Sequence, residues 1–147
     1  MQSIYLYDEV KIKRTKNPGI EIKTNLYFLP TGKENIAYKA AEMLIEEFHI
    51  EEGVHITLNK HIPVAAGMAG GSSNAAAVLF GMNKMFDLKL TQTELMERGV
   101  KLGADVPYCI MRGTVLAEGI GEELTTLTPM PKCFVLIAKP PISVSTK

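Results

Sequence analysis

A glycine-rich stretch between residues 63 and 86, PVAAGMAGGSSNAAAVLFGMNKMF, holds the residues best suited to chemistry. Glycines lack a Cβ, so the backbone amides of a tight turn can approach a ligand closely. Serines at the start of a helix lie where the first amides are unpaired and the helix dipole is positive. Such a turn entering a helix predicts an anion site, and phosphate is the usual anion. The residues concerned are Gly67, Gly70, Gly71, Ser72 and Ser73.

Two familiar phosphate motifs do not match this stretch. A Walker A loop requires GxxxxGK[ST], and here MAGGSS follows Gly67 without a lysine. A Rossmann fingerprint requires GxGxxG, which the spacing of Gly67, Gly70 and Gly71 does not provide. The remaining alternative is a tight turn with a serine N-cap and no ligand. The density of glycines and the paired serines favour phosphate, and the hydroxyls suit helix capping, phosphate contact or Mg²⁺ binding.

The apolar patterns on either side of the loop predict the elements that position it. Strands are expected over 8–15, 20–22 and 54–58, and again over 113–118, 123–127 and 133–139. Asn17, Pro18 and Gly19 are residue types that favour a turn, so the first two strands are expected to form a hairpin. Helices are expected over 34–50, 72–86 and 95–102, with capping boxes at Thr31/Glu34 and Thr91/Glu94 and a stop at Gly103. This order predicts an α+β fold, with helices against one face of a largely antiparallel sheet.

Composition excludes several classes of function. The chain has 147 residues, 46% of them hydrophobic, and it carries 16 basic and 16 acidic residues without a long block of one sign. Neither nucleic acid nor a membrane surface is expected as a partner. The first ten residues lack the pattern of a signal peptide. Cys109 and Cys133 fit no common zinc pattern, and we expect both to be buried free thiols in a reducing cytoplasm.

The glycine-rich stretch also resembles a known family. Residues 63–76, PVAAGMAGGSSNAA, resemble the phosphate loop of the GHMP kinases, P-x-x-x-G-L-G-S-S-A-A, with one extra glycine. Three further stretches match in order: ENIAYKAA at 34–41, GADVPYC at 103–109, and AKP at 138–140 with VST at 144–146. The extra glycine is typical of the branch that acts on 4-diphosphocytidyl-2-C-methyl-D-erythritol in non-mevalonate isoprenoid biosynthesis.

The resemblance implies a fold and a reaction. Residues 1–147 are expected to be the N-terminal, ATP-binding domain of a GHMP kinase, cut at both ends. Its fold is the two-layer α+β domain called ribosomal protein S5 domain 2-like, which has a left-handed βαβ crossover against the usual rule. The expected reaction transfers the γ-phosphoryl group of ATP, with Mg²⁺, to the 2-hydroxyl of that small-molecule substrate.

The same resemblance implies roles for particular residues. Asp105 matches the catalytic base; the alternative is a turn aspartate that bonds its own backbone. Asn35 and Lys60 match positions around the nucleotide; the alternatives are a helix-start residue that satisfies local amides and a solvated charge at a strand end. Ser73 is expected to contact Mg²⁺. The loop residues expected at the nucleotide are Pro63, Gly67, Gly70, Gly71, Ser72 and Ser73.

The departures from the family pattern limit what this chain is expected to do. It lacks the family's N-terminal A-K-[IL]-N-L lysine strand, its G-Y-H segment and its C-terminal domain. We therefore expect half a site and little or no kinase activity from this chain alone, with activity in the full-length parent. Two alternatives remain: another GHMP kinase, acting on homoserine, mevalonate or a sugar, and a non-catalytic nucleotide-binding module. The sequence predicts no particular oligomeric state.

Overall fold

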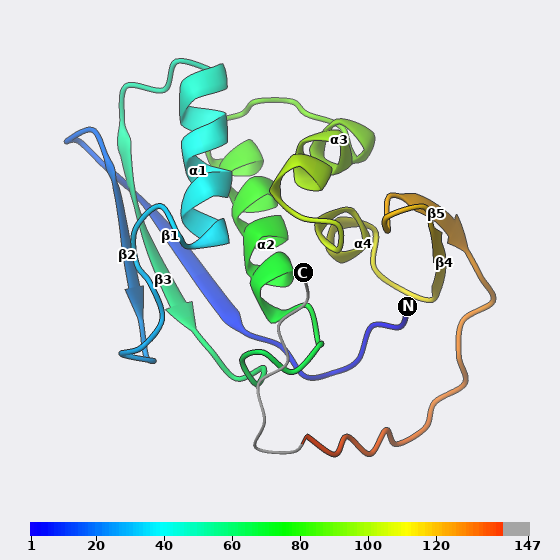
Figure 1. Ribbon diagram of the computed structural model, residues 1–147. Coiled ribbons are helices and arrows are strands. Elements are labelled where there is room, and N and C mark those ends of the chain that lie inside the picture. The colour runs from blue at the N-terminus through cyan, green and yellow to red at the C-terminus, as the bar shows by residue number, and fades with distance from the viewer. Residues whose placement is uncertain (140–147) are drawn as a thin grey trace.

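A three-stranded sheet forms one layer of the molecule, and helices cover one of its faces (Figure 1). The computed structural model describes residues 1–139. The strands of this sheet are β1 (Glu9–Thr15), β2 (Ile20–Thr24) and β3 (Gly53–Asn59), and β4 (Val115–Glu118) and β5 (Glu123–Thr126) form a separate hairpin. The helices are α1 (Ile36–Glu47), α2 (Gly70–Met85), α3 (Gln92–Leu102) and α4 (Val106–Met111). The predicted α+β class, with a sheet layer and a helix layer, is confirmed.

The core lies between β3 and the two helices nearest to it, α1 and α2. Side chains at alternate positions of β3 are buried, as the alternation in the sequence predicts. Alanines on the facing sides of α1 and α2 are also buried, and their small side chains allow the two helices to pack closely. The buried residues of these elements include Ala37, Ala40, Ala41, Leu44, Val54, Ile56, Leu58, Ala75, Leu79 and Met82.

The predicted hairpin of the first two strands is wrong, because β3 lies between them. β1 pairs antiparallel with β3, and β2 pairs parallel with it, so the sheet is mixed rather than largely antiparallel. The turn after β1 crosses the start of β3: the amide of Val54 donates to the carbonyl of Gly19 at 2.9 Å. A Cβ on Gly53 would lie 2.2 Å from the carbonyl oxygen of Asn17, so the crossing requires glycine. The most completely buried strand therefore occupies the centre, where both of its edges are paired.

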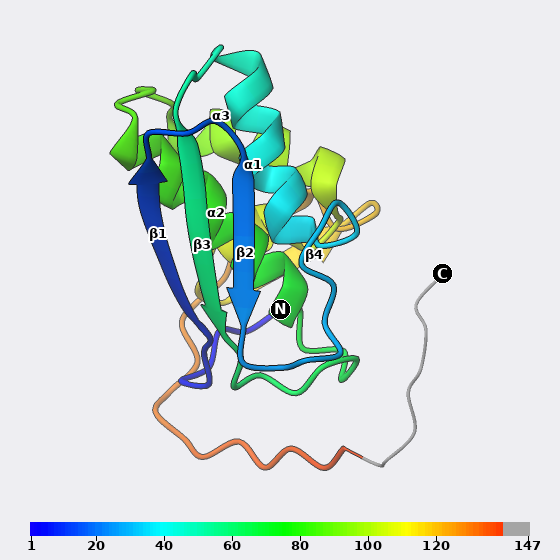
Figure 2. The same ribbon diagram turned by 90° about the vertical axis from the view of Figure 1, so that its left-hand side faces the viewer.

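The crossover from β2 through α1 to β3 is left-handed. In Figure 2 the sheet faces the viewer and the helices lie behind it; β2 and β3 both run downward, and β3 lies to the left of β2. With α1 behind the sheet, this arrangement has the opposite hand from the usual parallel crossover. The handedness that the resemblance implied is therefore present.

The helix starts agree with the predictions only in part. The capping box at Thr91 and Glu94 is present, with both reciprocal hydrogen bonds. The predicted capping box at Thr31 and Glu34 is wrong, because α1 starts two residues after Glu34 and its N-cap is Asn35. The amide of Asn35 donates to Gly32 at 2.9 Å, so these residues form a turn before the helix. The short helix α4 was not predicted, because a stretch of six residues is too short to show the helical spacing of apolar residues.

The end of the described chain differs from the prediction. The strands predicted over 113–118 and 123–127 are confirmed as β4 and β5, which pair as an antiparallel hairpin, but residues 133–139 form no strand. Cys133 is exposed and Cys109 is partly buried, so the prediction of two buried thiols is wrong for Cys133. Part of the AKP motif and the whole VST motif lie outside the described residues. Among residues 1–139, no helix is long and apolar enough to cross a membrane.

Candidate functional site

The N-terminus of α2 is an open end with unpaired amides. Its N-cap, Ala69, has left-handed backbone angles and offers no side-chain acceptor. The first amide with a partner is that of Ser73, which donates to the carbonyl of Ala69 at 2.8 Å. The amides of Gly70, Gly71 and Ser72 donate no hydrogen bond to any residue of the described chain. Three free donors at the positive end of a 16-residue helix suit an anion such as phosphate.

The three glycines of the loop have different physical reasons to be glycine. Gly67 has φ of +66°, in the left-handed region that favours glycine. A Cβ on Gly70 would lie 3.0 Å from Cγ2 of Ile62, closer than an ordinary contact. Gly71 is exposed, and its nearest contact would be ordinary, at 3.5 Å from Cγ2 of Ile36. Gly71 therefore leaves the exposed side of the helix end open to a ligand.

The two serines take different roles in the structure. The hydroxyl of Ser73 donates to the carbonyl of Gly70 at 3.0 Å, within the first turn of the helix. Its oxygen keeps lone pairs that could still bind a cation. The hydroxyl of Ser72 has no protein partner among residues 1–139. The described residues hold no cluster of three His, Cys, Asp or Glu that could bind a metal, so Ser73 would suit only a Mg²⁺ that arrives with phosphate.

Lys60 is a buried charge that forms hydrogen bonds within the protein. Its side chain is 5% exposed, so the alternative of a solvated strand-end charge is wrong. The ammonium donates to the carbonyl of Gly70 at 3.2 Å, to Oδ1 of Asn74 at 2.8 Å and to the carboxylate of Asp8. The sequence shows no sign of the role of Asp8, which precedes β1 and lies 52 residues from Lys60.

The carboxylate of Asp8 accepts hydrogen bonds from several donors. Its side chain is 1% exposed, and burial alone raises its pKa. Hydrogen bonds from Lys60, from the amides of Ile62 and His61, and from Asn74 outweigh that cost and hold the pKa of Asp8 below its ordinary value. Asp8 is therefore an ionised carboxylate next to the start of the glycine loop.

Asn35 holds the start of α1 close to the glycine loop. Its side chain accepts from the amide of Ala37 at 2.9 Å and donates to the carbonyl of Pro30 at 2.8 Å. The next residue, Ile36, is the nearest neighbour of the positions where Gly71 and Gly103 would carry a Cβ, at 3.5 and 3.4 Å. The starts of α1 and α2 and the turn before α4 therefore meet around Ile36.

Asp105 lies directly before α4, where it is partly buried. Its side chain makes no capping hydrogen bond, so the alternative of a carboxylate bonded to its own turn finds no support. Burial, together with the charge of Asp105, raises the pKa of the Cys109 thiol to about 11. The thiol is therefore protonated and unreactive near neutral pH.

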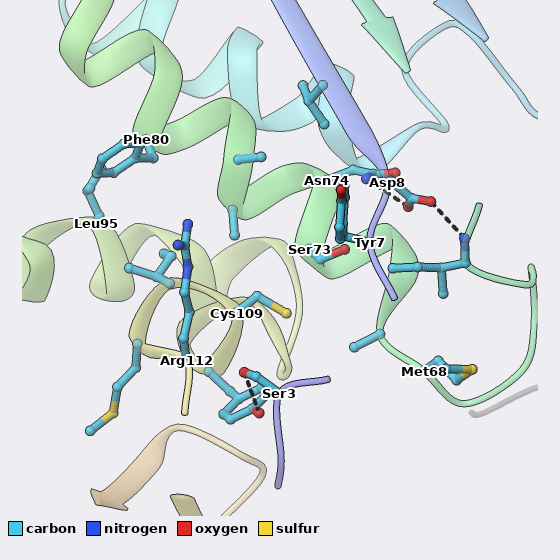
Figure 3. A pocket seen from close by; sticks show the side chains of 18 of the residues that line it. Ser3, Tyr7, Asp8, Met68, Ser73, Asn74, Phe80, Leu95, Cys109 and Arg112 are labelled. Carbon is cyan, nitrogen blue, oxygen red and sulfur yellow. Dashed lines mark hydrogen bonds between the residues drawn. The ribbon is translucent and has the colours of Figure 1, made fainter. Parts of the chain in front are cut away.

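A cleft of about 870 Å³ opens beside the glycine loop, between the N-terminal segment, α2 and α4 (Figure 3). Met68 and Ser73 border it on the loop side, and Cys109 and Arg112 lie on the α4 side. Asp105 is not among the residues that line this cleft. The structure thus brings Lys60, Gly70 and Ser73 together by hydrogen bonds, and Pro63 lies at the exposed start of the same loop.

Comparison with known proteins gives close relatives. A protein of Lachnoclostridium phytofermentans named 4-diphosphocytidyl-2-C-methyl-D-erythritol kinase is 60% identical over 147 residues, which are 100% of this chain and 50% of that protein. A protein of the same name from Lachnospira eligens is 56% identical over 100% of this chain and 51% of its own length. The chain thus spans about half the length of these relatives.

A solved structure and a family pattern agree with these relatives. The crystal structure of a 4-(cytidine 5'-diphospho)-2C-methyl-D-erythritol kinase matches with a TM-score of 0.70 and 34% identity, over 82% of this chain and 41% of that one. Residues 35–113, just over half of the chain, match the family described as "GHMP kinases N terminal domain". The matched region includes Asn35, the whole glycine loop and Asp105. This chain belongs to the GHMP kinase family, to the part that forms its N-terminal domain.

Proposed function

We propose that the protein to which this chain belongs transfers the γ-phosphoryl group of ATP to the 2-hydroxyl of 4-diphosphocytidyl-2-C-methyl-D-erythritol. The observation that carries the proposal is the set of free amides at the start of α2, on Gly70, Gly71 and Ser72. The names of relatives that are 60% and 56% identical support the choice of substrate. In this proposal residues 1–147 are part of the ATP-binding domain, and the reaction takes place in the cytoplasm as a step of isoprenoid biosynthesis.

The proposed mechanism assigns the binding of ATP to the loop. ATP supplies the phosphoryl group, and Mg²⁺ neutralises part of the phosphate charge. The amides of Gly70, Gly71 and Ser72 hold phosphate oxygens, and the positive end of α2 stabilises their charge. Ser73 offers its hydroxyl oxygen to Mg²⁺. Asn35, Pro63 and Gly67 lie around the nucleotide in this proposal.

Asp105 is the proposed base. Phosphoryl transfer needs a carboxylate that orients the attacking hydroxyl or accepts its proton. Asp105 suits this role because its side chain makes no capping bond and is partly exposed. Ile36 packs near both Gly71 and Gly103, so the turn that carries Asp105 lies near the start of α2.

The first experiment is a calorimetric titration of MgATP into this chain, with Gly71→Val as the control. We expect binding that the valine abolishes, because its side chain would cover the free amides. Folded protein that binds no MgATP would contradict the proposed phosphate site in this chain.

The second experiment adds the flanking segments that the relatives carry and measures ADP release with the cytidylyl substrate. We expect turnover that Asp105→Ala abolishes. MgATP binding without turnover in the extended protein would favour the non-catalytic module. Turnover with homoserine, mevalonate or a sugar in place of the cytidylyl substrate would favour another GHMP kinase.

A further inference from the structure

A buried polar cluster lies beneath the glycine loop and takes no part in the proposed chemistry. It consists of Asp8, Lys60 and Asn74, which come from the residue before β1, the residue after β3 and the first turns of α2. The side chains of Asp8 and Lys60 are 1% and 5% exposed, and Asn74 is 4% exposed as a residue. Figure 3 shows Asp8 and Asn74 next to each other at the edge of the cleft.

Every hydrogen of the Lys60 ammonium has an acceptor inside this cluster. A lysine ammonium has three donors, and here they reach Asp8, Asn74 and the carbonyl of Gly70. The amide group of Asn74 accepts from Lys60 and donates to Asp8 at 3.0 Å. A buried charge that lost its partner would be costly, so this arrangement holds the ammonium in place. Lys60 has no donor left for a phosphate.

The cluster joins the two ends of the loop. Asp8 accepts from the amides of His61 and Ile62, at 2.7 and 2.9 Å, directly before the loop. Lys60 bonds to Gly70, at the first position of α2, directly after the loop. The cluster therefore connects the chain on both sides of residues 63–69.

Hydrogen bonds within the loop do not set its shape. From residue 63 to residue 68, no hydrogen bond reaches any part of the described chain. Ala65 and Ala69 have φ of 53° and 51°, which costs energy for a residue with a Cβ. Such angles persist when the surrounding structure imposes them. The hydrogen-bonded ends of the loop are where such a constraint can act.

We propose that Asp8, Lys60 and Asn74 form a positioning network that sets the anion-binding shape of the glycine loop, and that Lys60 acts on phosphate through the loop rather than by direct contact. The consequence for MgATP rests on the proposed function, whereas the effect on the loop does not.

The test compares loop order in this chain and in three variants without nucleotide. The variants are Asp8→Asn, Lys60→Met and the double substitution, with Asp87→Asn as the control because the side chain of Asp87 is 83% exposed and far from the loop in sequence. The measured quantity is the NMR order parameter of the amides of Gly67, Gly70 and Gly71, with those of Ile56 and Leu58 as the internal reference. Order parameters of about 0.85 mark rigid backbone and values below about 0.6 mark flexible backbone.

We expect rigid loop amides in the wild type and in Asp87→Asn, and flexible ones in the cluster variants, with the β3 amides unchanged in all. A role limited to general stability would not change the loop relative to β3. Loop amides that are already flexible in the wild type, or that stay rigid in Asp8→Asn and Lys60→Met, would overturn the proposal. The result does not depend on whether the chain binds MgATP.

Titration of MgATP into the same five proteins then distinguishes the two possible roles of Lys60, through the network or by direct contact with phosphate. If Lys60 acts through the network, each single variant lowers affinity at least tenfold and the double variant loses no more than the worse single one. If Lys60 contacts phosphate directly, the losses in the two single variants multiply in the double variant, which would overturn the second part of the proposal. A wild-type chain with an ordered loop but no MgATP binding would count against the proposed function and leave the network in place.

Discussion

The ammonium of Lys60 donates a hydrogen bond to the carbonyl oxygen of Gly70, with the two atoms 3.2 Å apart. This contact joins the residue after β3 to the first residue of α2 across the glycine loop. The side chains of Lys60 and Ile62 also fill the space beside Gly70. A Cβ on Gly70 would lie 3.3 Å from the Lys60 nitrogen and 3.0 Å from Cγ2 of Ile62. The adjacent glycines at the start of α2, Gly70 and Gly71, therefore face different constraints, and this difference can be tested.

Gly70→Ala should destabilise the chain, whereas Gly71→Ala should not. The methyl group at residue 70 would lie closer to Ile62 and Lys60 than an ordinary contact, and overpacking of this kind costs about 1–3 kcal/mol. At residue 71 the nearest atom is 3.5 Å away, an ordinary contact, so the change should stay within about 1 kcal/mol. Urea unfolding of the two variants measures the difference. Equal losses of stability would show that space at Gly70 is not the constraint.

Asp8 should make the stability of the chain sensitive to acid. Its pKa in the folded protein lies below the ordinary value of 3.8, so its stabilising effect is complete above that value. The effect is lost as the pH falls through the lowered folded pKa, because the proton then binds to both states. Other carboxylates with lowered pKa values, such as Glu47, add to the same trend.

The contribution of Asp8 is isolated by comparing the wild type with Asp8→Asn. Urea midpoints measured from pH 7 to pH 2 should differ by a constant amount down to about pH 4 and converge below it, as the pH falls through the lowered pKa of Asp8. A constant difference across this range would mean that the charge of Asp8 does not stabilise the fold.

Asn35 variants should separate its capping role from its proposed contact with the nucleotide. Asn35→Ala removes the acceptor for the amide of Ala37 and should cost about 1 kcal/mol. Asn35→Ser keeps an oxygen acceptor at the N-cap, so stability should change little. If Asn35 contacts the nucleotide, both variants should lose affinity for MgATP. A serine variant with unchanged affinity would assign Asn35 to capping alone.

The charge of Asp105 should be measurable at Cys109. Burial raises the pKa of this thiol to about 11, and the negative charge of Asp105 contributes to the rise. Asp105→Asn should therefore lower the pKa of Cys109, while burial keeps it above the ordinary value of 9.0. The rate of alkylation as a function of pH reports the change in a Cys133→Ser background, since Cys133 is exposed. Asp87→Asn is the matched control, and an equal shift in both variants would remove Asp105 as the cause.

The sequence by itself determined the elements whose pattern is local. The helical faces of α1 and α2, the alternation of β3, the capping box at Thr91 and the hairpin of β4 and β5 each depend on residues close together in the chain. The glycines and serines at the start of α2 also identified the candidate anion site, because free amides and a helix start are local properties.

Only the tertiary structure decided the contacts between distant segments. Turn residues 17–19 predicted a hairpin, but β3 lies between the two strands because it is the strand buried most completely. The sequence left Lys60 either at the nucleotide or as a solvated charge at a strand end, whereas in the structure it is buried beside Asp8, 52 residues away. Burial and hydrogen bonding of such a pair depend on which strands become neighbours, and no pattern along the chain records that.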